Sequence, residues 1–315
     1  MEKKTSLNQS HRVMGARMVP FGGWDMPVHY GSQIDEHHAV REHAGMFDVS
    51  HMQIIDIHGS DSTRFLRHLL ANDVARLKEP GKALYTCMLN TDGGVIDDLI
   101  VYYCDETWYR LVVNAATADK DTAWIMQQMH DFEVEIQPRP ELAMIAVQGP
   151  HAIELAISQM NEDLGKACKR LKPFTATWDA SWFVGRTGYT GEDGFEIMLP
   201  QADAPDLWRA LAEAGVEVAA DGLIFEPSTV PAERITADAE YEGLRVRFEG
   251  RLNTSRIHMQ VDIGFGDAVF PEPVMAELPT VLGDQAPRLL CYSRESVIAE
   301  KVEAMVRHGE LNSRM

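Results

Sequence analysis

The chain has 315 residues and a formal net charge of −19, with 45% hydrophobic and 24% charged residues. This composition predicts a globular protein with room for two or three cores, and the acidic excess argues against a nucleic-acid partner, because phosphate backbones are bound by Lys and Arg. Short, interrupted apolar runs and scattered cysteines argue against a membrane span, a disulfide framework and a zinc site, so we expect free thiols, a cytoplasmic location, no metal and no membrane partner.

Apolar periodicity over the first 215 residues alternates between helix-like and strand-like stretches without a strict βαβ rhythm, which predicts an α+β fold. Asp61 or Ser62 is expected to cap the helix that begins there, since either side-chain oxygen can accept from a free amide of the first turn. In chain order the pattern predicts a helix over 33–43, a strand over 53–58, a helix over 61–70, a strand over 109–113, a helix over 118–129, a strand over 143–147, a helix over 152–160, strands over 182–186 and 195–199, and a helix over 204–214.

The pattern changes after Gly215. Residues 218–233 contain Gly222, Pro227, Ser228, Thr229 and Pro231 and are typical of a connector. Beyond them, alternation over 244–250 and 257–265 predicts two strands, and the six residues between them could close a hairpin. An amphipathic helix is expected over 294–307. We therefore divide the chain into residues 1–217, the connector 218–233, and a last segment, 234–315.

Two adjacent carboxylates interrupt the apolar stretch that follows the turn signal Gly93-Gly94. If this stretch is a strand, Asp97 and Asp98 point to opposite faces, because side chains alternate along a strand with a period of two. Only one of them can then face a given binding site. From the strand pattern alone, two solvated turn acids are the favoured interpretation.

Several long motifs give residues 5–217 a specific resemblance to a known family. They are GARMVPFGGWDMPVHY at 15–30, GMFDVSHM at 45–52, GKALYTCMLNTDGGVIDDLIVYY at 81–103, AVQGP at 146–150 and RTGYTGEDGFEI at 186–197. In order and spacing this region resembles the aminomethyltransferase of glycine cleavage, the T-protein, more closely than the related folate domains of sarcosine and dimethylglycine dehydrogenases. The resemblance implies a folate-binding region of two interleaved subdomains, a tetrahydrofolate cofactor, and the lipoylated carrier H-protein as partner in glycine catabolism and one-carbon metabolism.

The resemblance also implies roles for particular residues. Asp98 matches the family's catalytic carboxylate, which would stabilise a cationic, iminium-like carbon and orient the attacking amine. Glu196 matches the residue that grips the amino and imino edge of the pterin, for which a carboxylate is the complementary acceptor. The positions that line the folate cavity of the family correspond to Met52, Tyr85, Tyr102, Val113, Asn114 and Tyr189.

Each of these residue types also has a structural interpretation. The aromatic residues are more often half-buried packing residues, Met52 is more often core filler, and a Glu in an alternating strand is more often exposed. His51 could be interpreted as a general base, but we expect a structural histidine that is held by hydrogen bonds.

The resemblance to the T-protein ends at about Val218. The family continues with a GLGARD-LRLEAG type of segment, whose Arg binds a carboxylate of folate or substrate, and with a β-rich domain. Here Asp221-Gly222-Leu223 is followed by Ile-Phe-Glu-Pro, so that Arg has no counterpart. The chain thus resembles a fusion whose C-terminal third has been replaced.

Residues 221–315 resemble the later part of the AbiEii-type nucleotidyltransferase toxins. Asp262 matches a third metal-binding acid and Lys301 a helix motif of that family. The paired DxD that such an enzyme needs for its two magnesium ions is absent from 224–315, so this segment is interpreted as a catalytic remnant.

Three functions are therefore weighed. The first is folate-dependent aminomethyl transfer, in a chain whose activity the replaced third impairs. The second is nucleotide transfer, which would need a DxD from elsewhere in the chain. The third is an inactive fusion that only binds folate or the carrier protein. The motifs favour the first, and a folate-titrated thermal melt would discriminate best, since a ligand that binds the folded state raises its stability.

Overall fold

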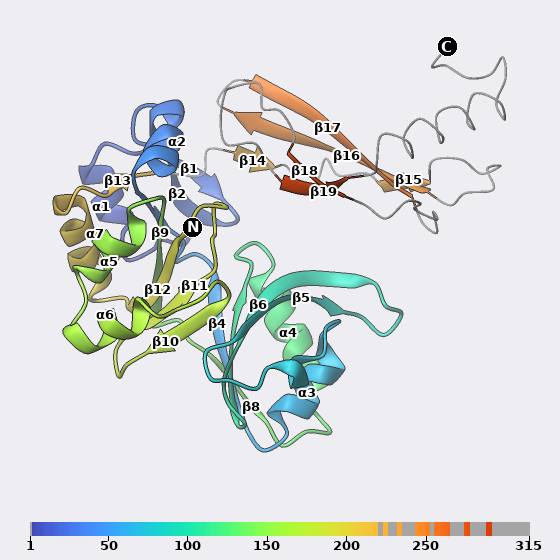
Figure 1. Cartoon of the computed structure of the whole chain (residues 1–315). Helices are drawn as coiled ribbons and strands as arrows, with labels where there is room; N and C mark the ends of the chain where they lie inside the picture. Colours follow the sequence, from blue (N-terminus) through green and yellow to red (C-terminus); the bar gives the residue numbers. More distant parts are fainter. Residues whose placement is uncertain are drawn as a thin grey trace, which may run out of the picture. The chain divides into compact units, whose positions relative to one another are not determined.

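A computed structural model of the chain describes residues 2–219 and, beyond them, the strand segments 223–225, 232–234, 243–252, 255–264, 274–277 and 288–291. The chain divides into two units, residues 1–222 and 223–315 (Figure 1). Each unit is described by itself below.

The first unit contains a six-stranded sheet in the order β10-β11-β12-β9-β3-β13. Its neighbouring strands are antiparallel, except that β13 pairs with β3 in parallel. The strands are β3 (Gly45–Asp48), β9 (Leu142–Gln148), β10 (Thr175–Trp178), β11 (Phe183–Arg186), β12 (Gly194–Pro200) and β13 (Glu217–Val218).

A second, five-stranded antiparallel sheet has the order β5-β6-β7-β4-β8. Its strands are β4 (Gln53–His58), β5 (Ala83–Leu89), β6 (Val95–Asp105), β7 (Trp108–Val113) and β8 (Glu135–Pro138). All five lie between β3 and β9 in the sequence. The chain therefore leaves the six-stranded sheet after β3, builds the whole five-stranded sheet, and returns to the first sheet at β9.

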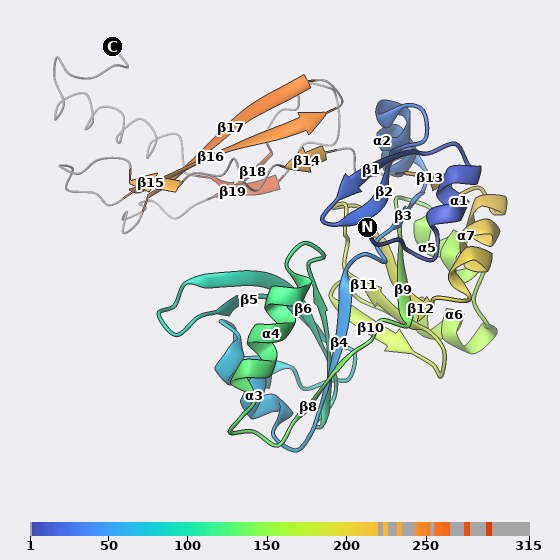
Figure 2. The ribbon, with the colours of Figure 1, turned by 180° about the vertical axis from the view of Figure 1, so that it is seen from behind.

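Two groups of helices lie against the two sheets, one group against one face of each sheet (Figures 1 and 2), while Val40 of α2 packs into the cluster on the opposite face of the six-stranded sheet. α3 and α4 lie against the five-stranded sheet, while α5, α6 and α7 lie against the six-stranded sheet. A hairpin of β1 (Arg17–Phe21) and β2 (Trp24–His29) precedes both sheets. The helices are α1 (Asn8–Val13), α2 (Gln33–Glu42), α3 (Ser62–Leu69), the 3₁₀ turn η1 (Val74–Arg76), α4 (Ala118–Gln128), α5 (Ala152–Ile157), α6 (Glu162–Cys168) and α7 (Ala204–Glu213).

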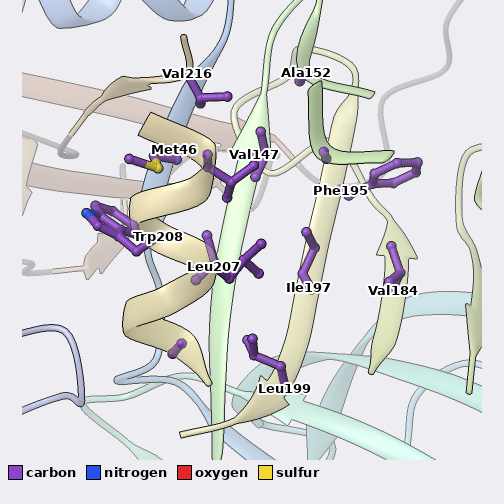
Figure 3. Close-up of a cluster of buried hydrophobic side chains, with 14 of the residues drawn as sticks. Met46, Val147, Ala152, Val184, Phe195, Ile197, Leu199, Leu207, Trp208 and Val216 are labelled. Atoms are coloured by element: carbon purple, nitrogen blue, oxygen red, sulfur yellow. The ribbon is translucent and has the colours of Figure 1, made fainter. Parts of the chain in front are cut away.

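Successive side chains of the central strands point to opposite faces of their sheets. The buried side chains of the first unit therefore form three separate clusters. On β12, Phe195, Ile197 and Leu199 pack under the helices, where Leu207 and Trp208 of α7 meet them (Figure 3). A corresponding cluster lies between the five-stranded sheet and its two helices. Each sheet thus buries one face under helices, as a period of two requires.

The opposite faces of the two sheets share a third cluster. It takes Met144 and Ala146 from β9 and Met198 from β12, together with Tyr102 of β6 and Val112 of β7. The two sheets therefore pack face to face, and a polar side chain such as Glu196, placed where the inner faces meet, is buried between them.

The prediction of a mixed α+β fold is confirmed, and every helix and strand predicted within residues 33–214 forms within a few residues of its expected bounds. The predicted N-cap position of the helix at 61–70 is confirmed, but the predicted capping hydrogen bond is wrong. Asp61 occupies the N-cap position of α3, but its side chain accepts no helix amide. It accepts instead from the Glu133 amide and from Arg64, while the Ser62 hydroxyl donates to the Gly59 carbonyl.

In the second unit, β16 (Gly243–Leu252) and β17 (Ser255–Gly264) form an antiparallel hairpin, which confirms the predicted pair of strands. The strands extend towards each other further than expected, because Leu252 pairs with Ser255. β14 (Leu223–Phe225) and β15 (Ala232–Arg234) each pair with one end of β16, and β18 (Val274–Glu277) pairs with β19 (Arg288–Cys291). Phe265, Lys301 and the helix expected over 294–307 lie outside the described residues.

Candidate functional site

Glu196 is the buried acid on the inner face of the six-stranded sheet. It lies on β12 between Phe195 and Ile197, which point to the helix side, so its own side chain points between the sheets. The residue is 4% exposed. The Thr187 hydroxyl donates a hydrogen bond to its Oε2. Burial raises the pKa of this carboxyl, and the Thr187 hydrogen bond opposes that rise only in part.

Tyr102 of β6, in the five-stranded sheet, lies near Glu196 between the two sheets. It belongs to the inter-sheet cluster and packs edge-on against Phe183, with ring centroids 5.1 Å apart. Among the described residues its buried hydroxyl has no hydrogen-bond partner. A Cβ on Gly185 would lie 2.5 Å from that hydroxyl, and Gly185 is paired with Glu196 across β11 and β12. Burial, and then the nearby Glu196, raise the pKa of Tyr102.

Asp98 lies on the same face of β6 as Tyr102, because the two are four residues apart along one strand. At about 3.3 Å per residue, their Cα atoms are roughly 13 Å apart. The Tyr85 hydroxyl, from the neighbouring strand β5, donates to Asp98 Oδ2. This hydrogen bond, together with desolvation, raises the pKa of Tyr85 to about 12.

Asp97 points to the opposite, helix-covered face of β6, as the strand period predicts. It accepts from the Thr117 hydroxyl, from Asn114 Nδ2 at 3.1 Å and from the Asp98 amide at 2.9 Å. Asn114 also donates to the Asp98 carbonyl at 3.1 Å, so both donors of the predicted folate residue are used within the chain. Burial alone would raise the pKa of Asp97, but hydrogen bonds from neighbouring groups, including Asp121, hold it below its usual value.

The remaining predicted positions differ in their surroundings. Met52 is partly buried against the inter-sheet cluster, and Tyr189 lies edge-on to Phe47 of that cluster at 5.9 Å between ring centroids. Val113 is 1% exposed and packs into the core between the five-stranded sheet and its helices. A contact of Val113 with a ligand would therefore have to come from its main chain.

His51 differs from the expected hydrogen-bonded histidine. Its Nδ1 is buried and, within the part of the chain that the structure describes, has no hydrogen-bond partner. Burial lowers the pKa of His51, against a smaller opposing effect of Asp48. The ring lies edge-on to Phe21 of β1, with centroids 5.5 Å apart.

The inner faces of the two sheets thus bring together a buried carboxylate, an unsatisfied phenol and a second carboxylate held by a tyrosine. Such an arrangement can accept hydrogen bonds from a donor-rich ligand at one end and can stabilise positive charge at the other. Across the described segments, no three or more His, Cys, Asp or Glu side chains gather in a way that could hold a metal ion.

Sequence reasoning did not single out Thr187, Gly185, Thr117 or Asp121. Thr187 lies inside a recognised motif, but its partner was not predictable. Asp121 had a detectable signal, because it shares an apolar helix stripe with Ala118 and Ile125 at spacings of three and four.

Comparison with known families gives two matches. The model described as the GCVT N-terminal domain matches residues 7–223. The model described as nucleotidyl transferase AbiEii toxin, type IV TA system, matches residues 195–315. Both resemblances inferred from the motifs are therefore confirmed. None of the helices within the described residues is long and apolar enough to cross a membrane.

Individual relatives match over the same region. The chain is 59% identical over 227 residues to an aminomethyltransferase of Xanthomonas campestris pv. campestris, which covers 70% of this chain and 62% of the relative. It is 57% identical over 224 residues to an aminomethyltransferase of Nitrosomonas eutropha, which covers 70% and 61%. The crystal structure of glycine cleavage system aminomethyltransferase T from Bartonella henselae is 35% identical, with a TM-score of 0.64, over 70% of this chain and 60% of that one. The chain thus spans less than two thirds of the length of these relatives.

Proposed function

The chain belongs to the GCVT N-terminal domain family over residues 7–223, and from that premise we propose that it is a tetrahydrofolate-dependent aminomethyltransferase. In this proposal the chain acts in glycine cleavage, in the cytoplasm, and takes the aminomethyl group from the lipoyl arm of the carrier H-protein. The roles of Asp98 as catalytic carboxylate and of Glu196 as pterin-binding residue are parts of the same proposal.

One observation carries the proposal: Glu196 is buried with a single hydrogen-bond donor, beside a buried Tyr102 hydroxyl that has no partner among the described residues. Burying polar groups without partners costs free energy. A ligand edge with adjacent amino and ring N–H groups would supply the missing donors to Glu196 in a paired, charge-assisted arrangement. The amino and imino edge of a pterin has this pattern, so the residues present fit the cofactor.

Asp98 fits the second half of the chemistry. When the aminomethyl carbon leaves the lipoyl sulfur it gains positive charge, and a fixed carboxylate beside it lowers the energy of that charge. Asp98 is held by the Tyr85 hydroxyl on one side and by its main-chain contacts with Asp97 and Asn114 on the other. Bound tetrahydrofolate supplies the nucleophilic nitrogen that takes over the carbon. Asp98 can also accept the proton that the attacking nitrogen loses and return it to the amine, which leaves as ammonia.

A second candidate is a fusion that binds folate without turnover. It is favoured by the limit of the family match at residue 223 and by the missing counterpart of the family's Arg in the segment that follows. Both candidates include the proposed pterin site. They differ only in whether the chain transfers the aminomethyl group. Nucleotide transfer is a weaker alternative, because residues 224–315 lack the paired DxD that would hold two magnesium ions.

The test is calorimetry with tetrahydrofolate on the full chain, followed by an assay with lipoylated carrier protein. We expect binding, and a loss of about ten- to a hundred-fold in affinity for Glu196→Gln, because a charge-assisted hydrogen bond is worth about 1.5–3 kcal/mol. Glu154→Gln on the exposed side of α5 makes the same chemical change and should bind like the parent. Equal affinity of Glu196→Gln and the parent would overturn the assignment of Glu196.

A further inference from the structure

Asp121 is a buried acid that the proposed reaction does not use. It lies in the first turn of α4 and shares the buried stripe of that helix with Ala118 and Ile125. Its exposure is 0%, whereas Asp119, two residues earlier on the same helix, has a side chain that is 94% exposed and lies 3.9 Å from Lys3. An acid on the apolar stripe of a helix needs either a partner or a proton.

The surroundings of Asp121 do not satisfy two ionised oxygens. Within the described residues, neither Oδ1 nor Oδ2 has a hydrogen-bond donor. The Lys120 ammonium is 3.7 Å from Oδ1, beyond hydrogen-bond length, and donates at 2.8 Å to the Ile96 carbonyl. Thr117 links Asp121 to another carboxyl, that of Asp97: its carbonyl accepts the Asp121 amide at 2.8 Å, and its hydroxyl donates to Asp97. Burial raises the pKa of both acids, and a hydrogen bond between the two carboxyls raises the pKa of Asp121 further and lowers that of Asp97. Two ionised carboxylates repel each other, but one proton between them makes a strong hydrogen bond.

The remaining contacts show which of the two acids keeps the proton. Asp97 receives donors from Thr117, from Asn114 and from the Asp98 amide, and all of these favour its ionised form. Burial, and then Asp97, raise the pKa of Asp121 to about 7, against smaller opposing effects of Thr117 and Lys120. The charged groups that act on Asp121 from the packed elements are thus Asp97 on β6 and Lys120 on its own helix.

Asp97 connects this pair to the site. One of its oxygens accepts the Asp98 amide, and the Asn114 side chain joins that same oxygen to the Asp98 carbonyl. Asp97 therefore fixes the main chain on both sides of the Asp98 side chain. If Asp121 lost its proton, the repulsion would act directly on the group that holds Asp98.

We propose that Asp121 keeps its proton on the acidic side of neutral pH, donates it to Asp97, and through this acid pair holds Asp98 in place, so that Asp121 is a positioning residue of the site. The protonation concerns the chain itself. The effect on Asp98 rests on the proposed function.

The first test is carbon-13 NMR of the aspartate carboxyl groups in the free full-length chain, titrated from pH 4 to pH 9. We expect one carboxyl resonance with a midpoint near 7, present in the parent and in Asp119→Asn and absent in Asp121→Asn. Asp119→Asn is the matched control, since it makes the same change on the same helix at an exposed position. A titration with no aspartate midpoint above pH 5, or a high midpoint that persists in Asp121→Asn, would overturn the proposal.

The second test follows tetrahydrofolate affinity by calorimetry over pH 6 to 8.5. The parent and Asp119→Asn should bind more weakly as Asp121 ionises above pH 7. Asp121→Asn keeps a donor towards Asp97, so its difference from the parent should shrink or reverse at high pH. Asp121→Ala should bind roughly five- to tenfold more weakly at neutral pH, since one hydrogen bond is lost.

The outcomes separate the two proposals. If the parent binds no tetrahydrofolate at any pH, the proposed function fails, and the carbon-13 titration alone decides the acid pair. If the parent and Asp121→Asn bind with the same pH dependence, the positioning role is overturned while folate binding stands. Should Asp121→Ala fail to fold, Asp97→Asn tests the same pair, because it should lower the midpoint of Asp121 while the effect of burial remains; an unchanged midpoint would overturn the pairing.

Discussion

At the scale of single residues, the buried acids of this chain differ in how many hydrogen-bond donors surround them. Asp56 is paired with Arg110 at 2.7 and 2.8 Å and also receives Arg139. Asp48 accepts from Thr5 at 2.6 Å and contacts His11 Nε2 at 2.8 Å. Structural acids are therefore supplied with donors. Glu196 receives only the Thr187 hydroxyl, and Asp121 has no donor among the described residues. This difference separates the acids that stabilise the fold from Glu196, for which we propose a ligand, and Asp121, for which we propose a bound proton.

This difference predicts opposite stability effects. Burial raises the pKa of Glu196 above that of the unfolded chain, so its contribution to stability is fully present below about pH 4.5 and is lost as the pH rises through the folded-state pKa. Without ligand, Glu196→Gln should therefore be more stable than the parent at pH 7.5, by about 1–3 kcal/mol, with a smaller gap at pH 5. Asp56→Asn should lose about 3–5 kcal/mol, because it leaves the buried Arg110 without its ion-pair partner.

Denaturant unfolding of the three chains at pH 5 and pH 7.5 measures these effects. A loss of stability for Glu196→Gln at pH 7.5 would mean that Glu196 is a structural acid, and would remove the observation on which the pterin site rests.

The two adjacent aspartates give a second prediction at this scale. Asp98→Asn keeps the shape and removes the anion, and the loss of one such group typically slows a reaction by ~10²–10³-fold. Asp97→Asn should cost less, because Asp97 acts on Asp98 through the main chain. Rates of aminomethyl transfer from lipoylated carrier protein would measure both. Equal losses in the two variants would contradict the assignment of Asp98.

At the scale of elements, the sequence predicted strands and helices well wherever apolar periodicity was clean. β4 was predicted with its observed bounds, 53–58. The hairpin of β1 and β2 was missed because Pro20 and Pro27 lie inside its strands, and proline argues against a strand. The opposite orientation of Asp97 and Asp98 followed from the strand period alone.

The packing of the two sheets against each other could not be predicted from apolar periodicity. That Tyr102 of one sheet meets Glu196 of the other depends on how two sheets, separated in the sequence, pack together. Only the resemblance to a family suggested that both belong to one site. The hydrogen bond from Thr187 to Glu196 and the role of Gly185 are likewise properties of the packed strands.

Gly185 tests this packing. A Cβ there would lie 2.5 Å from the Tyr102 hydroxyl and 3.1 Å from its Cζ, inside a core where Tyr102 is 0% exposed. Gly185→Ala should therefore cost about 1–3 kcal/mol of stability, as overpacking does, and should weaken tetrahydrofolate binding. Adding Tyr102→Phe removes the closest atom and should restore part of the stability. Unfolding curves that show no loss for Gly185→Ala would mean that the strands do not approach so closely.

At the scale of the whole molecule, the family boundary and the structural boundary coincide. The GCVT match ends at residue 223, and the chain divides between Gly222 and Leu223. The sequence indicated a departure at about Val218, because the motifs stop there. It also predicted the β16–β17 hairpin, through its alternation. The placement of Asp262 on β17 carries no information on a metal site, and the proposed connector and last segment stay predictions.

The last prediction concerns the activity of the chain as it stands. Its first unit keeps Asp98, Asn114 and Glu196, but the chain spans 62% of a relative such as the Xanthomonas enzyme, and the family's Arg has no counterpart after Gly222. Loss of one charge-assisted hydrogen bond costs about 1.5–3 kcal/mol, or roughly ten- to a hundred-fold in affinity. We therefore expect weaker tetrahydrofolate binding than in that relative, little or no glycine-cleavage turnover, and no metal-dependent nucleotide transfer.

Calorimetry of this chain and of the relative, side by side, together with a coupled assay containing lipoylated carrier protein, measures the difference. The expected loss of affinity has a physical reason, because the two ends of the cofactor would bind to different parts of the protein. In the proposed function, Glu196 and Tyr102 of the inter-sheet site would bind the pterin, but a carboxylate at the far end of the cofactor needs a cation that residues 224–227 do not supply. Turnover close to that of the relative would show that the Arg is dispensable, and that the inner faces of the two sheets are sufficient for transfer.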